Sequence, residues 1–66
     1  MIQVNGKTAV LTEDIHTVSD LLVHYQLNPK LVIVEQNGQI VEKEAYGITI
    51  VQDGDKIELV HFVGGG

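Results

Sequence analysis

Residues 56–66 have the sequence KIELVHFVGGG. The first eight of them alternate as a half-buried strand does, and they form the longest such alternation in the chain. One face of the predicted strand carries Ile57, Leu59, His61 and Val63, and the other carries Lys56, Glu58, Val60 and Phe62. The first set indicates a core face. We therefore expect a long final strand, which lies beside the first strand of the chain at the centre of a sheet.

Val60 and Phe62 make the second face of this strand apolar just before the glycines, and Phe62 is the only phenylalanine. Exposed apolar patches often mark docking sites. We therefore predict that Val60 and Phe62 contact a partner protein. The alternative is that sheet curvature or a loop covers Phe62.

The glycines Gly64, Gly65 and Gly66 predict a flexible tail, residues 64–66, behind a single domain of residues 1–63. Glycine has no Cβ and can pass through a narrow channel, and three residues extend to about 10 Å. The α-carboxyl of Gly66 is the predicted working group, because glycine hinders attack on it least. The alternative is a frayed end, although frayed ends are usually mixed and polar in sequence.

The first half of the chain predicts a hairpin and a helix. Asn5-Gly6 favours a type I′ turn, which would join strands at residues 1–5 and 7–12. Thr17 is a suitable N-cap with Asp20 at the third helical position. We expect about three helical turns, ended by Asn28-Pro29. The apolar face of this helix would carry Val18, Leu21, Leu22 and Tyr25.

The second half predicts strands and turns. Strands are expected at residues 31–34, 39–41 and 48–50, with a helical turn or loop at 42–46. Asn37-Gly38 and Asp53-Gly54-Asp55 are predicted turns. One helix covers one face of such a sheet, so the fold class is α+β. We expect a β-grasp arrangement, a mixed sheet of four to five strands with one main helix packed on one face.

Composition excludes several functions. The formal net charge is −5, from nine acidic residues and four lysines without arginine, which argues against nucleic acid and anionic membranes as partners. There is no cysteine, no apolar run long enough to span a membrane and no signal-peptide pattern, so we expect a cytoplasmic protein. The histidines His16, His24 and His61 fit no ligand spacing, so no metal site is predicted.

These features together resemble the ThiS family, the ubiquitin-like sulfur carriers of thiamine biosynthesis. The resemblance covers the whole chain, and its most specific parts are the Asp53-Gly54-Asp55 turn, the last strand and the diglycine end. It implies that an E1-like adenylyltransferase uses ATP to activate Gly66. Sulfur from a cysteine desulfurase or another donor then gives a thiocarboxylate, from which thiazole synthase takes the sulfur. Gly64 and Gly65 would serve tail recognition.

The chain offers no catalytic side chains and no cofactor site of its own, so it is predicted to be a carrier and not an enzyme. Two alternatives stay open on the residues alone. The small subunit of molybdopterin synthase would use an activated C-terminal glycine in the same way for a different sulfur acceptor, although that family tends to be longer. A ubiquitin-like protein modifier or interaction module would use the same glycine end.

Overall fold

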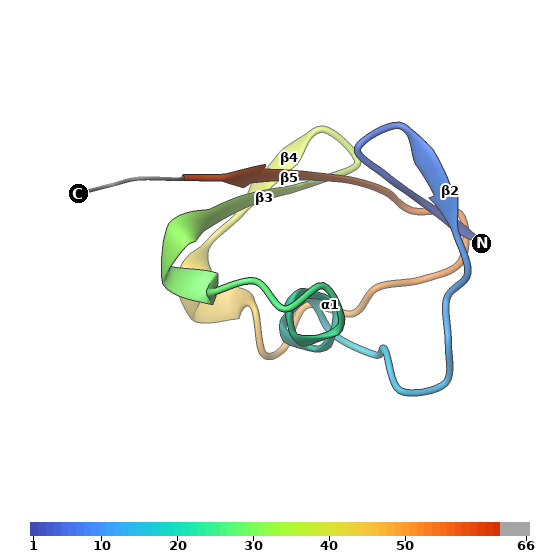
Figure 1. Ribbon diagram of the computed structural model, residues 1–66, viewed down its shortest axis with the longest axis horizontal. Coiled ribbons are helices and arrows are strands. Elements are labelled where there is room, and N and C mark those ends of the chain that lie inside the picture. Colours follow the sequence, from blue (N-terminus) through green and yellow to red (C-terminus); the bar gives the residue numbers. More distant parts are fainter. Residues whose placement is uncertain (63–66) are drawn as a thin grey trace.

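The computed structural model describes residues 1–62, which form a sheet of five strands with one α-helix (Figure 1). The strands are β1 (Ile2–Val4), β2 (Lys7–Ala9), β3 (Val32–Gln36), β4 (Gln39–Val41) and β5 (Lys56–His61). The helix α1 (Val18–His24) and the 3₁₀ turn η1 (Pro29–Leu31) lie between β2 and β3, and a second 3₁₀ turn, η2 (Lys43–Ala45), follows β4. Figure 1 shows α1 on one side of the sheet, so the predicted α+β class and β-grasp arrangement are confirmed.

β5 lies at the centre of the strand order β2-β1-β5-β3-β4. It is parallel to β1, with Val4 opposite Ile57, and antiparallel to β3, with Val34 opposite Leu59. The sheet is therefore mixed, and the first and last strands lie side by side as predicted.

Two Asn-Gly pairs make the hairpin turns. Asn5 and Gly6 have φ values of 51° and 81°, and Asn37 and Gly38 have 53° and 85°. Positive φ at both central residues is what a type I′ turn requires. The first turn joins β1 to β2 and the second joins β3 to β4, so both predicted turns are confirmed.

The core lies between α1 and the facing side of the sheet. Its buried residues are Ile2, Val4, Ile15, Val18, Leu21, Leu22, Val32, Val34, Tyr46, Val51 and Ile57. Tyr46 is a member that the sequence pattern did not indicate, because it lies in a polar segment. Its hydroxyl donates a 2.8 Å hydrogen bond to the Val32 carbonyl, and burial raises the pKa of the Tyr46 phenol. The η2 segment is thereby fastened to β3.

The start of α1 is a capping box, as predicted from Thr17 and Asp20. Thr17 Oγ1 accepts a hydrogen bond from the Asp20 N–H at 3.2 Å. The Asp20 carboxylate in turn accepts from the N–H groups of His16 (2.9 Å) and Thr17 (3.0 Å). These bonds stabilise the ionised carboxylate and hold the pKa of Asp20 below its usual value.

The end of α1 differs from the prediction. The helix stops at His24, about two turns after it begins, and not near Asn28-Pro29. Tyr25 is the C-cap and is 39% exposed, so it does not complete the buried stripe that Val18, Leu21 and Leu22 form.

A Schellman arrangement explains this early stop. The Gln26 N–H donates to the Val23 carbonyl and the Leu27 N–H donates to the Leu22 carbonyl, both at 2.9 Å. This closure puts Gln26 at φ 58°, in the left-handed region that glycine usually occupies. No glycine marks this position in the sequence, which is why the predicted helix end was misplaced.

The predicted strand at residues 48–50 is wrong. This segment makes a single bridge, Ile50 opposite Thr17. The Val18 N–H donates to the Thr49 carbonyl at 2.9 Å, so the segment pairs with the start of α1 and not with the sheet. Strand bounds also shift: β2 ends at Ala9 and β3 begins at Val32.

The strained Gln26 gives a stability prediction. A left-handed conformation costs about 1–2 kcal/mol for a residue with a Cβ, and glycine avoids this cost. Against this gain, glycine raises the conformational entropy of the unfolded chain, which lowers stability by up to about 1 kcal/mol. Gln26→Gly should therefore raise the free energy of unfolding by about 0.5–1 kcal/mol in urea denaturation. Gln26→Ala, which keeps the Cβ, is the control and should give no gain. A loss of stability in Gln26→Gly would contradict this account of the helix end.

Candidate functional site

The candidate site lies at the end of β5, where the strand leads toward the predicted tail. Gly64, Gly65 and Gly66 lie outside the described residues, as does Val63. The structure does describe the two predicted docking residues. Val60 is 52% exposed and Phe62 is 49% exposed, so neither is covered by another described element.

The strand register explains why these side chains are exposed. Ile57 is buried on the face toward α1, and successive side chains alternate between faces, so Val60 and Phe62 point to the other face. The Phe62 N–H donates to the Leu31 carbonyl at 2.9 Å, which continues the pairing with β3 beyond His61. Phe62 is thus held by a backbone hydrogen bond although its side chain is half exposed.

Neighbouring strands enlarge this apolar surface. Ile33 lies directly opposite Val60, and Ile40 on β4 lies opposite Glu35 on the same outer face. We call the resulting surface the outer-face patch; it consists of Leu31, Ile33, Ile40, Val60 and Phe62. Leu31 is 42% exposed and Ile40 is 58% exposed. The sequence pattern indicated only Val60 and Phe62, because the other members join the patch through cross-strand register.

Glu35 and Glu58 border the outer-face patch and lie directly opposite each other on β3 and β5. Like charges in such a position repel and destabilise a sheet slightly. They add to the net charge of −5. The face is thus apolar near Phe62 and acidic at Glu35 and Glu58, with Lys56 beyond them, so a basic group of a partner would be favourable beside the two glutamates.

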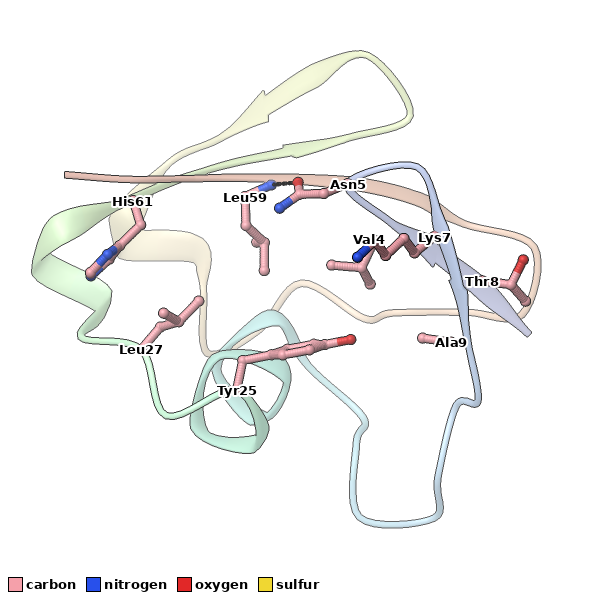
Figure 2. A pocket seen from close by; sticks show the side chains of 9 residues that line it. All are labelled: Val4, Asn5, Lys7, Thr8, Ala9, Tyr25, Leu27, Leu59 and His61. Atoms are coloured by element: carbon pink, nitrogen blue, oxygen red, sulfur yellow. Dashed lines mark hydrogen bonds between the residues drawn. The ribbon is translucent and has the colours of Figure 1, made fainter. Parts of the chain in front are cut away.

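The opposite side of β5 borders a hollow of about 490 Å³, shown in Figure 2. We call it the hairpin hollow; it is lined by Val4, Asn5, Lys7, Thr8, Ala9, Tyr25, Leu27, Leu59 and His61. Leu59 and His61 were expected on the core face, and they do point to the side of α1. Leu59 is half-buried, but His61 is exposed, because no described element covers the end of β5 there.

Asn5 connects the hollow to β5. Its side-chain oxygen accepts a 2.7 Å hydrogen bond from the Leu59 N–H, drawn as a dashed line in Figure 2. Its backbone N–H donates to the Ile57 carbonyl at 2.9 Å. Asn5 therefore has a second role besides the turn, and it holds the hairpin against the terminal strand.

The predicted Asp53-Gly54-Asp55 turn lies at the other end of β5, with Gly54 at φ 90°. Burial acts to raise the pKa of Asp55, but hydrogen bonds from the Gln52 N–H and the side chains of Asn37 and Gln36 outweigh it, so this pKa lies below its usual value. The carboxylate thus has a structural role. Within residues 1–62, no three His, Cys, Asp or Glu side chains gather as a metal site would require. In the same range, no helix has the length and hydropathy for a membrane crossing.

Comparison with known proteins identifies the family. The ThiS family model matches residues 2–66. The sulfur carrier protein ThiS of Bacillus subtilis is 52% identical over 66 residues, which are the whole of both chains. This chain belongs to the ThiS family. The resemblance stated from the sequence is therefore confirmed.

Two further relatives are consistent with this family assignment. The crystal structure of the thiamine biosynthesis protein ThiS of Geobacter metallireducens matches with a TM-score of 0.80 at 39% identity, and the match covers 98% of this chain and 97% of that one. A thiazole synthase of Magnetococcus marinus is 42% identical over 50 residues, which are 76% of this chain and 15% of that protein. A short part of that synthase therefore resembles the family.

The exposure of Phe62 leads to a stability prediction. Phe62→Ala should lower the free energy of unfolding by less than about 1 kcal/mol, since the side chain already contacts water and few packing contacts are lost. Ile57→Ala, a fully buried position on the same strand, should cost about 2–5 kcal/mol. Both values can be measured by urea denaturation. A cost for Phe62→Ala as large as that for Ile57→Ala would mean that the faces of β5 are reversed.

Proposed function

We propose that this chain delivers sulfur for thiazole formation in thiamine biosynthesis, carried as a thiocarboxylate on Gly66. The observation that supports it most is the 52% identity to a protein named as the sulfur carrier ThiS, over the whole of both chains. Membership of the ThiS family makes the chain a carrier and not a catalyst. The position that is modified, and the enzymes that modify it, belong to the proposal.

The proposed chemistry needs activation, because a carboxylate is a poor electrophile. An E1-like adenylyltransferase joins the Gly66 carboxylate to the α-phosphate of ATP and releases pyrophosphate. The persulfide of a cysteine desulfurase, or another sulfur donor, then displaces AMP; a thiol cleaves the resulting acyl disulfide and leaves the thiocarboxylate. ATP binds to the activating partner, and this chain contributes only the acyl group.

Thiazole synthase is the proposed acceptor. Two proteins named thiazole synthase, from Magnetococcus marinus and Paramagnetospirillum magneticum, contain a 50-residue segment that is 42% and 46% identical to this chain. The segment makes up 15% of each protein, so there a carrier-like part is joined to a synthase in one chain. This favours thiazole synthase over molybdopterin synthase or a conjugated lysine as the destination of the acyl group.

The surfaces of β5 fit the role of a carrier. The outer-face patch would dock Val60 and Phe62 on the activating enzyme or the synthase, while Gly64 and Gly65 would pass through the narrow entrance to its active site. This division lets the domain be recognised while the reactive group reaches the chemistry. We expect the exchange to take place in the cytoplasm, without nucleic acid or membrane.

A reconstitution tests the terminal group. Incubation with ATP, the adenylyltransferase and a sulfur source should raise the mass of the C-terminal peptide by the difference between sulfur and oxygen. Deletion of Gly66 should abolish the change without altering the thermal unfolding of the domain, because the deleted residue follows the last strand. An unchanged mass in the intact protein, or a sulfur adduct on another residue, would refute the proposal.

The docking role of Phe62 can be tested by calorimetry with the adenylyltransferase and with thiazole synthase. Phe62→Ala should weaken at least one of these complexes by more than about 1 kcal/mol, which is typical of a central apolar anchor. Val23→Ala is the matched control, since Val23 is 75% exposed on α1, away from the outer-face patch. If both variants bind both enzymes like the unmodified protein, Phe62 has no docking role.

A further inference from the structure

The edge of β5 that faces β1 is only partly paired. In an antiparallel ladder, bonded and non-bonded residue pairs alternate along the strands. The Asn37 N–H donates to the Lys56 carbonyl and the Phe62 N–H donates to the Leu31 carbonyl, so even-numbered residues of β5 bond to β3. The backbone groups of Ile57, Leu59 and His61 therefore point toward β1.

Of the three residues Ile57, Leu59 and His61, only Ile57 pairs with β1. The pairing of β1 with β5 ends at Val4 opposite Ile57, and the chain then turns away at Asn5-Gly6. The Asn5 N–H donates to the Ile57 carbonyl, and the Asn5 side-chain oxygen accepts from the Leu59 N–H. Within residues 1–62, the Leu59 carbonyl and the His61 N–H have no hydrogen-bond partner. A central strand thus has an open edge at residues 59–61.

The hairpin hollow lies along this open edge. Its volume of about 490 Å³ is large enough for a side chain of any size, and Val4, Leu27 and Leu59 make its walls largely apolar. Figure 2 shows the Tyr25 ring lying across the hollow toward β2. A strand that pairs with β5 would direct alternate side chains into it.

The residues that line the hollow include basic but no acidic side chains, whereas the chain as a whole has a negative net charge. The chain has nine acidic residues, yet the lining contains none of them and includes Lys7 and His61. Figure 2 shows the Lys7 ammonium group extending from β2 toward the middle of the hollow. Within the described residues, Lys7 has no ion-pair partner. The hollow thus favours an apolar segment that also carries a carboxylate.

We propose that an extended segment of the adenylating enzyme adds to the sheet beside residues 59–61 of β5. The segment takes the place that β1 leaves at Asn5, accepts a hydrogen bond from the His61 N–H and donates one to the Leu59 carbonyl. One apolar side chain fills the hairpin hollow, and an acidic side chain pairs with Lys7. This mode is strand addition, in which backbone bonds give affinity and the hollow gives specificity.

The inference rests on the proposed function, because the occupant is the enzyme that activates Gly66. Residues 59–61 immediately precede the segment that this enzyme must hold. Backbone bonds at this edge would fix β5 against the enzyme, which lowers the entropy cost of bringing the carboxylate to ATP. The outer-face patch lies on a face and the hollow at an edge, so both can be used at once.

Amide hydrogen exchange of the isotope-labelled protein tests the proposal. In the unbound protein, the His61 amide should exchange fast and the neighbouring Phe62 amide slowly, because only Phe62 donates to β3. Saturation with the adenylyltransferase should slow exchange at His61 by about tenfold or more, as one new backbone bond would do. Phe62 is the reference within the same strand and should change little.

A pair of variants separates the backbone bond from simple covering. His61→Ala keeps the N–H and removes the ring, whereas His61→Pro removes the N–H as well. Proline is tolerated where the N–H makes no ladder bond, and the melting temperature of each variant shows whether it is folded. His61→Pro should bind the adenylyltransferase about five- to tenfold more weakly than His61→Ala. Lys7→Gln should also weaken binding, and Lys56→Gln at the far end of β5 is its control.

The outcomes are distinct. A saturated complex in which His61 exchanges as fast as in the unbound protein overturns the inference and leaves the proposed function standing. Equal affinities of His61→Pro and His61→Ala for the adenylyltransferase would also overturn the inference and leave the proposed function standing. Protection of His61 that grows with the concentration of this chain alone would assign the edge to a second copy, against the proposal. Failure to form any complex, with no thiocarboxylate, overturns the proposed function and this inference together.

Discussion

β5 is hydrogen-bonded on both edges only after the two ends of the chain have met, since Gln3 and Val4 pair with Lys56 and Ile57. The elements that lie between have little stability of their own. An isolated helix of seven residues is not stable in water, and an isolated two-stranded hairpin is marginal at best. The parallel pairing closes nearly the whole chain into one loop, and its entropy cost is met only when the core forms with it. The domain should therefore fold as one cooperative unit.

The sequence predicted the features that are decided locally. Asn-Gly pairs readily adopt the positive φ that a type I′ turn requires, the Thr17–Asp20 capping box depends on residues three apart, and the alternation of residues 56–61 is visible in the chain itself. The central, adjacent placement of the first and last strands was predicted from these elements, whereas the full strand order came from the structure. Gln26 shows the limit of such signals, because a Schellman closure put a residue with a side chain where glycine would be expected.

The rest depended on register and burial, which no local pattern contains. Tyr46 looked like part of a polar loop, yet its ring fills the core and its hydroxyl bonds to β3. Ile33 belonged to an apolar run that predicted a strand but not which side chains it buries. No element of residues 1–62 covers the outer side of Ile33, and it lies beside Val60 there. Two of the five residues of the outer-face patch were thus predictable from the final strand alone, and the other three came from the segments beside it.

The central position of β5 has a mechanical consequence. A force applied at the end of β5 and directed along the strand would act parallel to β1 and β3, and so across the perpendicular hydrogen bonds to β3 and the slanted hydrogen bonds to β1. In this shear geometry the bonds bear the load together, whereas a strand peeled from a sheet edge loses them one after another. An enzyme that pulls on the C-terminal end of β5 would therefore act against the hydrogen bonds of both ladders at once, and the sheet would keep its register.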